Sequence, residues 1–166
     1  MEYTKTPPLP REAPKMPTRR LLPLLLFFTL ISSCAQKPKP VLPPKVTGTE
    51  TFSLVSQWML DNPGGAIAIT SETLGRTLLI TRDKKGELHT LDSWCPHQGC
   101  SVSPAQGDHL ECPCHISKFS IEGGHISGPA PAGLIEYAHV QQGDELTVDF
   151  SDRTLRDANG IVIVEK

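Results

Sequence analysis

The chain has 166 residues, of which 38% are apolar, so it can form one domain of ordinary size with one core and has no room for a second. Sixteen prolines and thirteen glycines disfavour a helical bundle. The formal charge is −2 and there is no basic stripe, so nothing favours a nucleic-acid partner. We expect an all-β module.

The first 33 residues have the order of a secretory signal. An apolar run, residues 21–31, follows the basic pair Arg19-Arg20, and this is the arrangement of n-region and h-region in such signals. The run is too short to cross a bilayer, which takes about 20 residues. Its Pro23 disfavours a buried core helix. We interpret residues 1–33 as a signal peptide, in which residues 18–22 also resemble a twin-arginine export motif.

The signal ends in a sequence, residues 31–34, that resembles the lipobox of bacterial lipoproteins. Small residues there precede Cys34, which would be diacylated and become the new N-terminus. The alternative is an ordinary signal peptide that leaves Cys34 as a free thiol. Residues 34–47 are rich in proline and predict a polyproline-like tether. Such a tether would let the folded part, residues 48–166, stand off a membrane and reorient.

The folded part reads mainly as short strands separated by glycine-containing turns. A helical turn is expected near residues 54–60, ended by Asn62-Pro63-Gly64-Gly65. The predicted strands cover residues 66–70, 77–81, 87–92, 109–112, 117–121, 135–140, 145–150 and 161–165.

Two short boxes on loops between these strands combine cysteine with histidine. Box one is Cys95-Pro-His97-Gln98-Gly-Cys100, and box two is Cys112-Pro-Cys114-His115-Ile-Ser117. One cysteine and one histidine from each box make a tetradentate site for a soft or borderline metal. Zinc is one candidate, although Cys₂His₂ zinc sites usually take both cysteines from one hairpin and both histidines from a helix.

Both boxes match the pattern of the Rieske 2Fe-2S family, C-x-H-x-G-C followed by C-x-C-H-x-S, and the chain resembles this family over residues 65–148. The resemblance implies an antiparallel β-sandwich or barrel in which two loops form a cluster-binding subdomain, about residues 92–131. It further implies a Rieske 2Fe-2S cluster, with Cys95 and Cys112 on one iron and His97 and His115 on the other. Cys100 and Cys114 would form a disulfide between the loops.

The same resemblance assigns neighbours of the cluster. Ser117 matches a serine that hydrogen-bonds a bridging sulfide, and Gly128-Pro129 opens a segment that matches the family's proline loop. Phe119 stands where quinol-oxidising members have a tyrosine bonded to a ligand sulfur, so we expect a lower reduction potential than theirs. Gln98 replaces their usual leucine, which leaves the mode of docking open.

The predicted function is electron transfer, as the iron-sulfur subunit of a quinol:cytochrome c or plastocyanin-type oxidoreductase. Its partners would be a cytochrome b subunit, a c-type cytochrome and quinol, on the outer face of a membrane to which the lipid holds it. The alternative is the small Rieske subunit of an exported molybdenum oxidase of the arsenite oxidase type. The boxes offer no catalytic acid, base or nucleophile, so any enzyme activity would belong to the assembly.

Two further classes have less support in the sequence. A cytosolic Rieske ferredoxin usually lacks the second cysteine of each box, whereas Cys100 and Cys114 are present here. A metal-free binding module stapled by disulfides would leave the two histidines of the boxes without a role.

Overall fold

A computed structural model describes residues 38–104, 109–157 and 159–163 of the chain. Its secondary structure is strands and one short 3₁₀ turn, Trp58–Leu60, within these ranges. The all-β prediction is confirmed. Among the described residues there is no helix with the length and apolar character needed to cross a membrane. The predicted signal, residues 1–33, and Cys34 lie outside the described residues.

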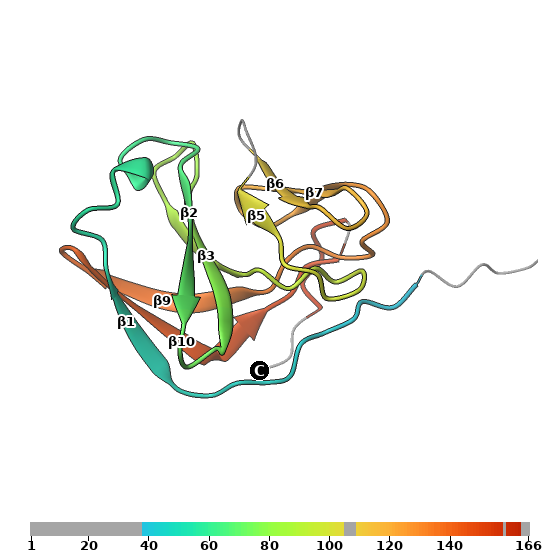
Figure 1. Ribbon diagram of the computed structural model, residues 1–166, viewed down its shortest axis with the longest axis horizontal. Helices are drawn as coiled ribbons and strands as arrows, with labels where there is room; N and C mark the ends of the chain where they lie inside the picture. The colour runs from blue at the N-terminus through green and yellow to red at the C-terminus, as the bar shows by residue number, and fades with distance from the viewer. Residues whose placement is uncertain (1–37, 105–108, 158, 164–166) are drawn as a thin grey trace, which may run out of the picture. The chain divides into compact units, whose positions relative to one another are not determined.

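The larger sheet has six strands in the order β1-β10-β9-β4-β3-β2, and all neighbours are antiparallel (Figure 1). Strands β4 and β9 share a single paired position, Leu91 with Glu136. The sheet is therefore nearly divided into two three-stranded halves. Its strands are β1 (Thr49–Ser53), β2 (Ala66–Ser71), β3 (Arg76–Arg82), β4 (Leu88–Asp92), β9 (Glu136–Gln142) and β10 (Glu145–Thr154).

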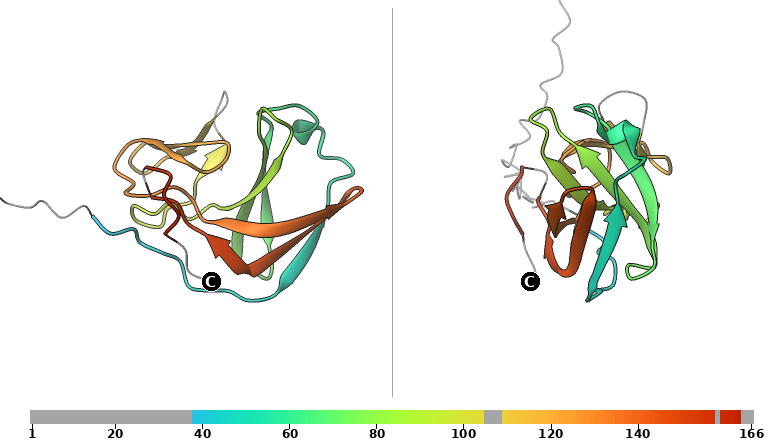
Figure 2. Two further views of the ribbon diagram at one scale, coloured as in Figure 1. Left: turned by 180° about the vertical axis from the view of Figure 1, so that it is seen from behind. Right: turned by 90° about the vertical axis from the view of Figure 1, so that its left-hand side faces the viewer.

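The smaller sheet has four strands in the order β5-β6-β7-β8 and lies to one side of the larger sheet (Figure 2). It carries the second box between its two central strands. The strands are β5 (Ser103–Pro104), β6 (His109–Cys112), β7 (Ser117–Ser120) and β8 (His125–Ser127).

Strand β3 contributes side chains to two separate hydrophobic cores. Successive strand residues point to opposite faces, so Leu78 and Ile80 enter the core between the halves of the larger sheet. Leu79 points the other way, into a second core that also contains Phe119 of the smaller sheet. A strand buried on both faces is a continuous apolar run rather than an alternating one, as the sequence Leu78-Leu79-Ile80 is. The second core also contains Cys95 and Cys112.

Most predicted strands are present, with ends shifted by a few residues. The structure adds three that the sequence did not predict, β1, β5 and β8. The strand predicted over residues 161–165 is wrong for its described part, since residues 161–163 make only the isolated bridge of Val162 with Arg156. Residues 164 and 165 lie outside the described residues.

Part of the Pro-rich segment that is predicted to be a tether contacts the folded domain. Pro43 is buried, and Val46 packs against the core of the larger sheet. Val41 hydrogen-bonds to the loop of box one. Backbone groups of Val41 and Pro43 thus find partners on the domain in place of water, while most other residues of the segment are exposed.

His89 joins the two halves of the larger sheet near their single paired position. Its Nδ1 is 2.7 Å from a carboxylate oxygen of Glu136 on β9, and its Nε2 is 3.7 Å from the Asp83 carboxylate. The hydrogen bond to Glu136 raises the pKa of His89; burial opposes the rise, and the charges of Glu136, Asp83 and Glu122 add to it. The neighbouring His139 has a lowered pKa because it is partly buried.

We predict that His89 stabilises the fold more at low pH than at high pH. A group whose pKa is raised by folding contributes its full stabilisation below its unfolded pKa, and that contribution is lost as pH rises through the folded pKa. In urea unfolding, the difference in free energy between the parent protein and His89→Gln should be larger at pH 6 than at pH 9. A difference that does not change with pH would contradict the ion pair, and Glu136→Gln should reduce the same pH dependence.

Candidate metal centre

The two boxes occupy adjacent loops that are tied together covalently. Box one follows β4, and box two links β6 to β7. Cys100 and Cys114 form a disulfide with an S–S distance of 2.04 Å. The Sγ atom of Cys112 lies within 4.8 Å of both disulfide sulfurs. The pairing implied by the family resemblance is therefore present, and it holds the loops side by side.

Short backbone turns give each box its shape. In box one, the N–H of Gly99 donates to the carbonyl of Cys95, and the N–H of Cys95 donates to the carbonyl of Cys100. In box two, the N–H of Ile116 donates to the carbonyl of Cys112, and Ile116 has a positive φ of 56°.

The four candidate ligands come together in pairs of the same chemical type. Cys95 and Cys112 are buried in the same cluster, and the interaction of the two thiols contributes to raising the pKa of Cys95. The imidazole rings of His97 and His115 meet edge to face, with centroids 4.6 Å apart. The site therefore has a sulfur side and a nitrogen side.

The two sides differ in their exposure to solvent. Cys95 and Cys112 are 1% and 2% exposed, while His97 is half-buried and His115 is exposed. Burial raises the pKa of the Cys95 thiol to about 11; Cys112 adds to the rise, and the backbone N–H groups of His97 and Gln98 oppose it by donating to the sulfur. A buried thiolate needs a positive partner, so this donor set fits a metal with sulfur ligands.

The segment expected to be a proline loop contacts box two. Ser117 is buried, and its hydroxyl oxygen accepts a hydrogen bond from the N–H of Ala130 at 3.2 Å. The hydroxyl proton thus remains for donation to another acceptor. Gly128 and Pro129 are exposed on this loop, and Gly128 approaches the backbone of box two closely.

The other two residues predicted to lie near the cluster, Phe119 and Gln98, differ in their exposure to solvent. Phe119 is fully buried in β7, with its ring edge to face with His125 at 6.1 Å. Gln98 is exposed at the tip of box one.

A buried polar group that no sequence pattern reveals holds the backbone just before box one. Asp92, the last residue of β4, is fully buried and accepts hydrogen bonds from Arg76 Nε at 2.9 Å and Tyr137 Oη at 2.7 Å. It also accepts from the backbone N–H of Trp94 at 2.9 Å. Burial opposes a high pKa for Arg76, but its hydrogen bonds to Asp92 raise it. Burial, followed by the charge of Asp92, raises the pKa of Tyr137.

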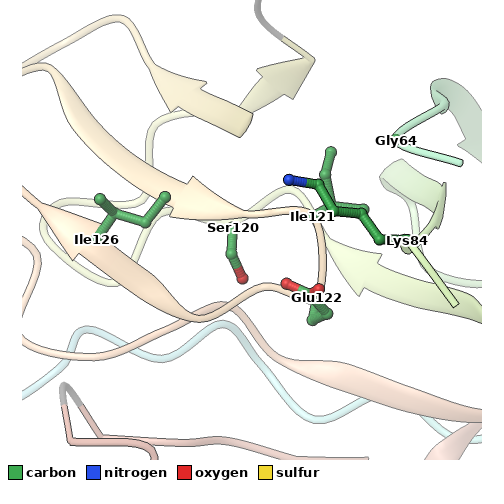
Figure 3. A pocket seen from close by; sticks show the side chains of 6 residues that line it. All are labelled: Gly64, Lys84, Ser120, Ile121, Glu122 and Ile126. Carbon is green, nitrogen blue, oxygen red and sulfur yellow. The ribbon is translucent and has the colours of Figure 1, made fainter. Parts of the chain in front are cut away.

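A hollow of about 230 Å³ elsewhere on the domain does not involve the boxes. Figure 3 shows Lys84 and Glu122 at this hollow together with Ile121 and Ile126. Its lining contains no cysteine or histidine, so we assign no metal or redox role to it.

The chain is similar in sequence to several known proteins. A family model described as the Rieske 2Fe-2S domain matches residues 60–152. The cytochrome b6-f complex iron-sulfur subunit of Microcystis aeruginosa is 28% identical over 163 residues, which cover 88% of this chain and 90% of that protein. The chloroplastic subunit of the same name from Chlamydomonas reinhardtii is 37% identical over 81 residues, 48% of this chain and 39% of that protein.

A solved structure has the same fold. The crystal structure of the cyanobacterial plasma membrane Rieske protein PetC3 from Synechocystis PCC 6803 matches with a TM-score of 0.50 and 20% identity. The match covers 60% of this chain and 98% of that one.

We predict that Gly128→Ala destabilises the domain more than Gly143→Ala does. Both glycines have positive φ, 94° and 60°, so both substitutions strain the backbone. A Cβ at Gly128 would also lie 2.6 Å from Ser117 Cα, whereas nothing lies within 4 Å of one at Gly143. We expect an additional loss of about 1–3 kcal/mol in unfolding free energy, measured in urea. Equal losses would show that the loop does not press on box two.

Proposed function

Because the chain belongs to the Rieske 2Fe-2S domain family, we propose that it is the electron-transfer subunit of a membrane oxidoreductase of the cytochrome b6-f type. The observation that carries this proposal is the pairing of two buried thiols with two imidazoles that reach the surface, on loops joined by a disulfide. The relative from Microcystis aeruginosa, covered over most of its length, supports the class of complex. The alternative of a molybdenum-oxidase subunit is not favoured, since the related proteins are cytochrome b6-f subunits.

We assign Cys95 and Cys112 to one iron of the cluster and His97 and His115 to the other. The thiols are neighbours of each other and so are the imidazoles, which supports this division. When bound, the cluster supplies one-electron transfer, and its two histidine ligands give it a higher potential than four-cysteine clusters have.

Residues around the site have different roles. Buried Cys95 and Cys112 exclude water from the sulfur side, and the disulfide holds the two loops at a fixed separation. An imidazole that binds metal through one ring nitrogen keeps the other nitrogen for a proton. Because His115 is exposed, that nitrogen can exchange protons with solvent or with a docked quinol.

Two residues, Ser117 at the end of box two and Phe119 just beyond it, bear on the reduction potential. The Ser117 hydroxyl, held by Ala130, keeps its proton for donation to a sulfide, and such a donor raises the potential. Phe119 has no hydroxyl to offer a ligand sulfur. We therefore expect a potential below that of the tyrosine-containing quinol-oxidising members.

We further propose that the protein is exported and held by lipid at Cys34 on the outer face of a membrane. The basic pair, the apolar run of residues 21–31 and the lipobox-like sequence of residues 31–34 support this. A diacylated cysteine buries enough methylene groups for stable attachment. A cytochrome b subunit and a c-type cytochrome are the partners that a b6-f-type assembly implies.

Substitution of single candidate ligands tests the assignment. We predict two iron atoms per chain and a rhombic EPR signal in the reduced parent protein. Cys112→Ser and His115→Ala should each lose nearly all of the iron and the signal, because a missing ligand leaves the site incomplete. His109→Gln, a histidine outside the boxes, is the matched control and should keep both. Iron retained at the parent level in either ligand variant would contradict the assignment.

The location of the protein after cell fractionation tests the anchor. We predict that the parent chain is recovered with membranes and that Cys34→Ser moves most of it to the soluble fraction, because the acyl chains are lost. Mass spectrometry of the purified protein should find the lipid on Cys34. An unmodified Cys34 in membrane-bound protein would contradict lipid attachment at this residue.

A further inference from the structure

Residues 40–46, which we call the strap, are attached to the domain at several points. Val41 uses both of its backbone groups: its N–H donates to the carbonyl of Pro96 at 2.8 Å, and its carbonyl accepts from Trp94 Nε1 at 3.0 Å. The carbonyl of buried Pro43 accepts from Arg153 at 3.4 Å. Val46 packs against the core of the larger sheet. The strap thus reaches from that core to box one, as its cyan trace in Figure 1 shows.

Trp94, the residue before box one, also contacts the strap, and its own position is fixed from several sides. A Cβ on Gly99 would lie 2.6 Å from its indole ring, so the ring rests directly on that glycine. The guanidinium carbon of Arg76 is 5.8 Å from the ring centroid, and the backbone N–H of Trp94 donates to Asp92. The indole N–H is therefore held in the direction of Val41.

The second contact of Val41 falls on a peptide group that also touches a candidate ligand. The carbonyl of Pro96 and the N–H of His97 belong to one peptide unit. The carbonyl accepts from Val41 at 2.8 Å, and the N–H lies close enough to the Cys95 thiol to lower its pKa. Hydrogen bonds in such a chain polarise one another, so the outer bond strengthens the inner one.

We propose that the strap sets the reduction potential of the centre, with Val41 and Trp94 as positioning residues that keep the Pro96–His97 peptide turned toward the Cys95 sulfur. This inference rests on the proposed role of Cys95 as an iron ligand. Hydrogen bonds to ligand sulfurs stabilise the additional negative charge of the reduced form and raise the potential. Release of the strap should therefore lower the potential without removing any ligand.

A pair of variants at one position separates the backbone donor from the side chain. In the full chain, Val41→Pro removes the N–H that bonds to Pro96, whereas Val41→Ala keeps it, and the parent side chain is 44% exposed. We expect the EPR signal to be present in both variants. In an EPR-monitored redox titration, the potential should shift downward in Val41→Pro and remain at the parent value in Val41→Ala.

A second pair tests the docking itself and does not depend on the cluster. Trp94→Phe keeps a ring on Gly99 but loses the indole donor, and Trp58→Phe, at a tryptophan that is 73% exposed, is its control. Hydrogen exchange followed by mass spectrometry should show the Val41 amide protected in the parent and in Trp58→Phe. In Trp94→Phe its exchange should be at least roughly fivefold faster, as expected for loss of a cooperating hydrogen bond, and the potential should fall.

The outcomes that overturn the inference are distinct. Equal potentials in Val41→Pro and Val41→Ala, with the EPR signal intact, would show that the strap does not act on the centre. A Val41 amide that exchanges in the parent as fast as in an unfolded chain would show that the strap is not docked. Absence of iron from the parent would overturn the ligand assignment and the tuning together, and protection of Val41 would then still identify a docked strap.

Discussion

The site depends on one buried carboxylate, that of Asp92. It ends β4 and accepts hydrogen bonds from Arg76, Tyr137 and the backbone N–H of Trp94, the residue before box one. A carboxylate with no exposure to solvent is stable only while its hydrogen-bonding partners are in place, and removing one partner of a buried pair typically costs about 3–5 kcal/mol. The larger sheet therefore fixes where box one begins, and the orientation of Trp94 follows from it.

The two sides of the site differ in their exposure to solvent. The second core buries Cys95 and Cys112 together with Leu110 and Phe119, because those positions continue the inward faces of the strands beside them. The histidines follow on loop turns, where their rings reach the surface. An electron carrier needs this division, since the sulfur side must be kept dry while the other side must be open to a partner.

The chemistry of the site could be predicted from sequence because its cysteines and histidines lie a few residues apart within two short boxes. The two boxes identified the family, the cofactor and the disulfide between Cys100 and Cys114, which the structure contains. The packing of the strap could not be predicted, because Val41 and Trp94 are 53 positions apart and their contact uses a backbone carbonyl that any residue has. Asp92 was missed for the same reason, since its partners Arg76 and Tyr137 lie on other strands. The short strands β5 and β8 have too few residues to show an alternating pattern.

The central claim is that one iron of the cluster is held by His97 and His115 and the other by Cys95 and Cys112. Electron–nuclear double resonance of the reduced protein, grown with ¹⁵N-labelled histidine, tests it most directly. The account predicts strong couplings from two histidine nitrogens in the parent protein, and their persistence in His109→Gln and His125→Gln. A spectrum without strong ¹⁵N-histidine couplings, in protein that carries two iron atoms per chain, would contradict it.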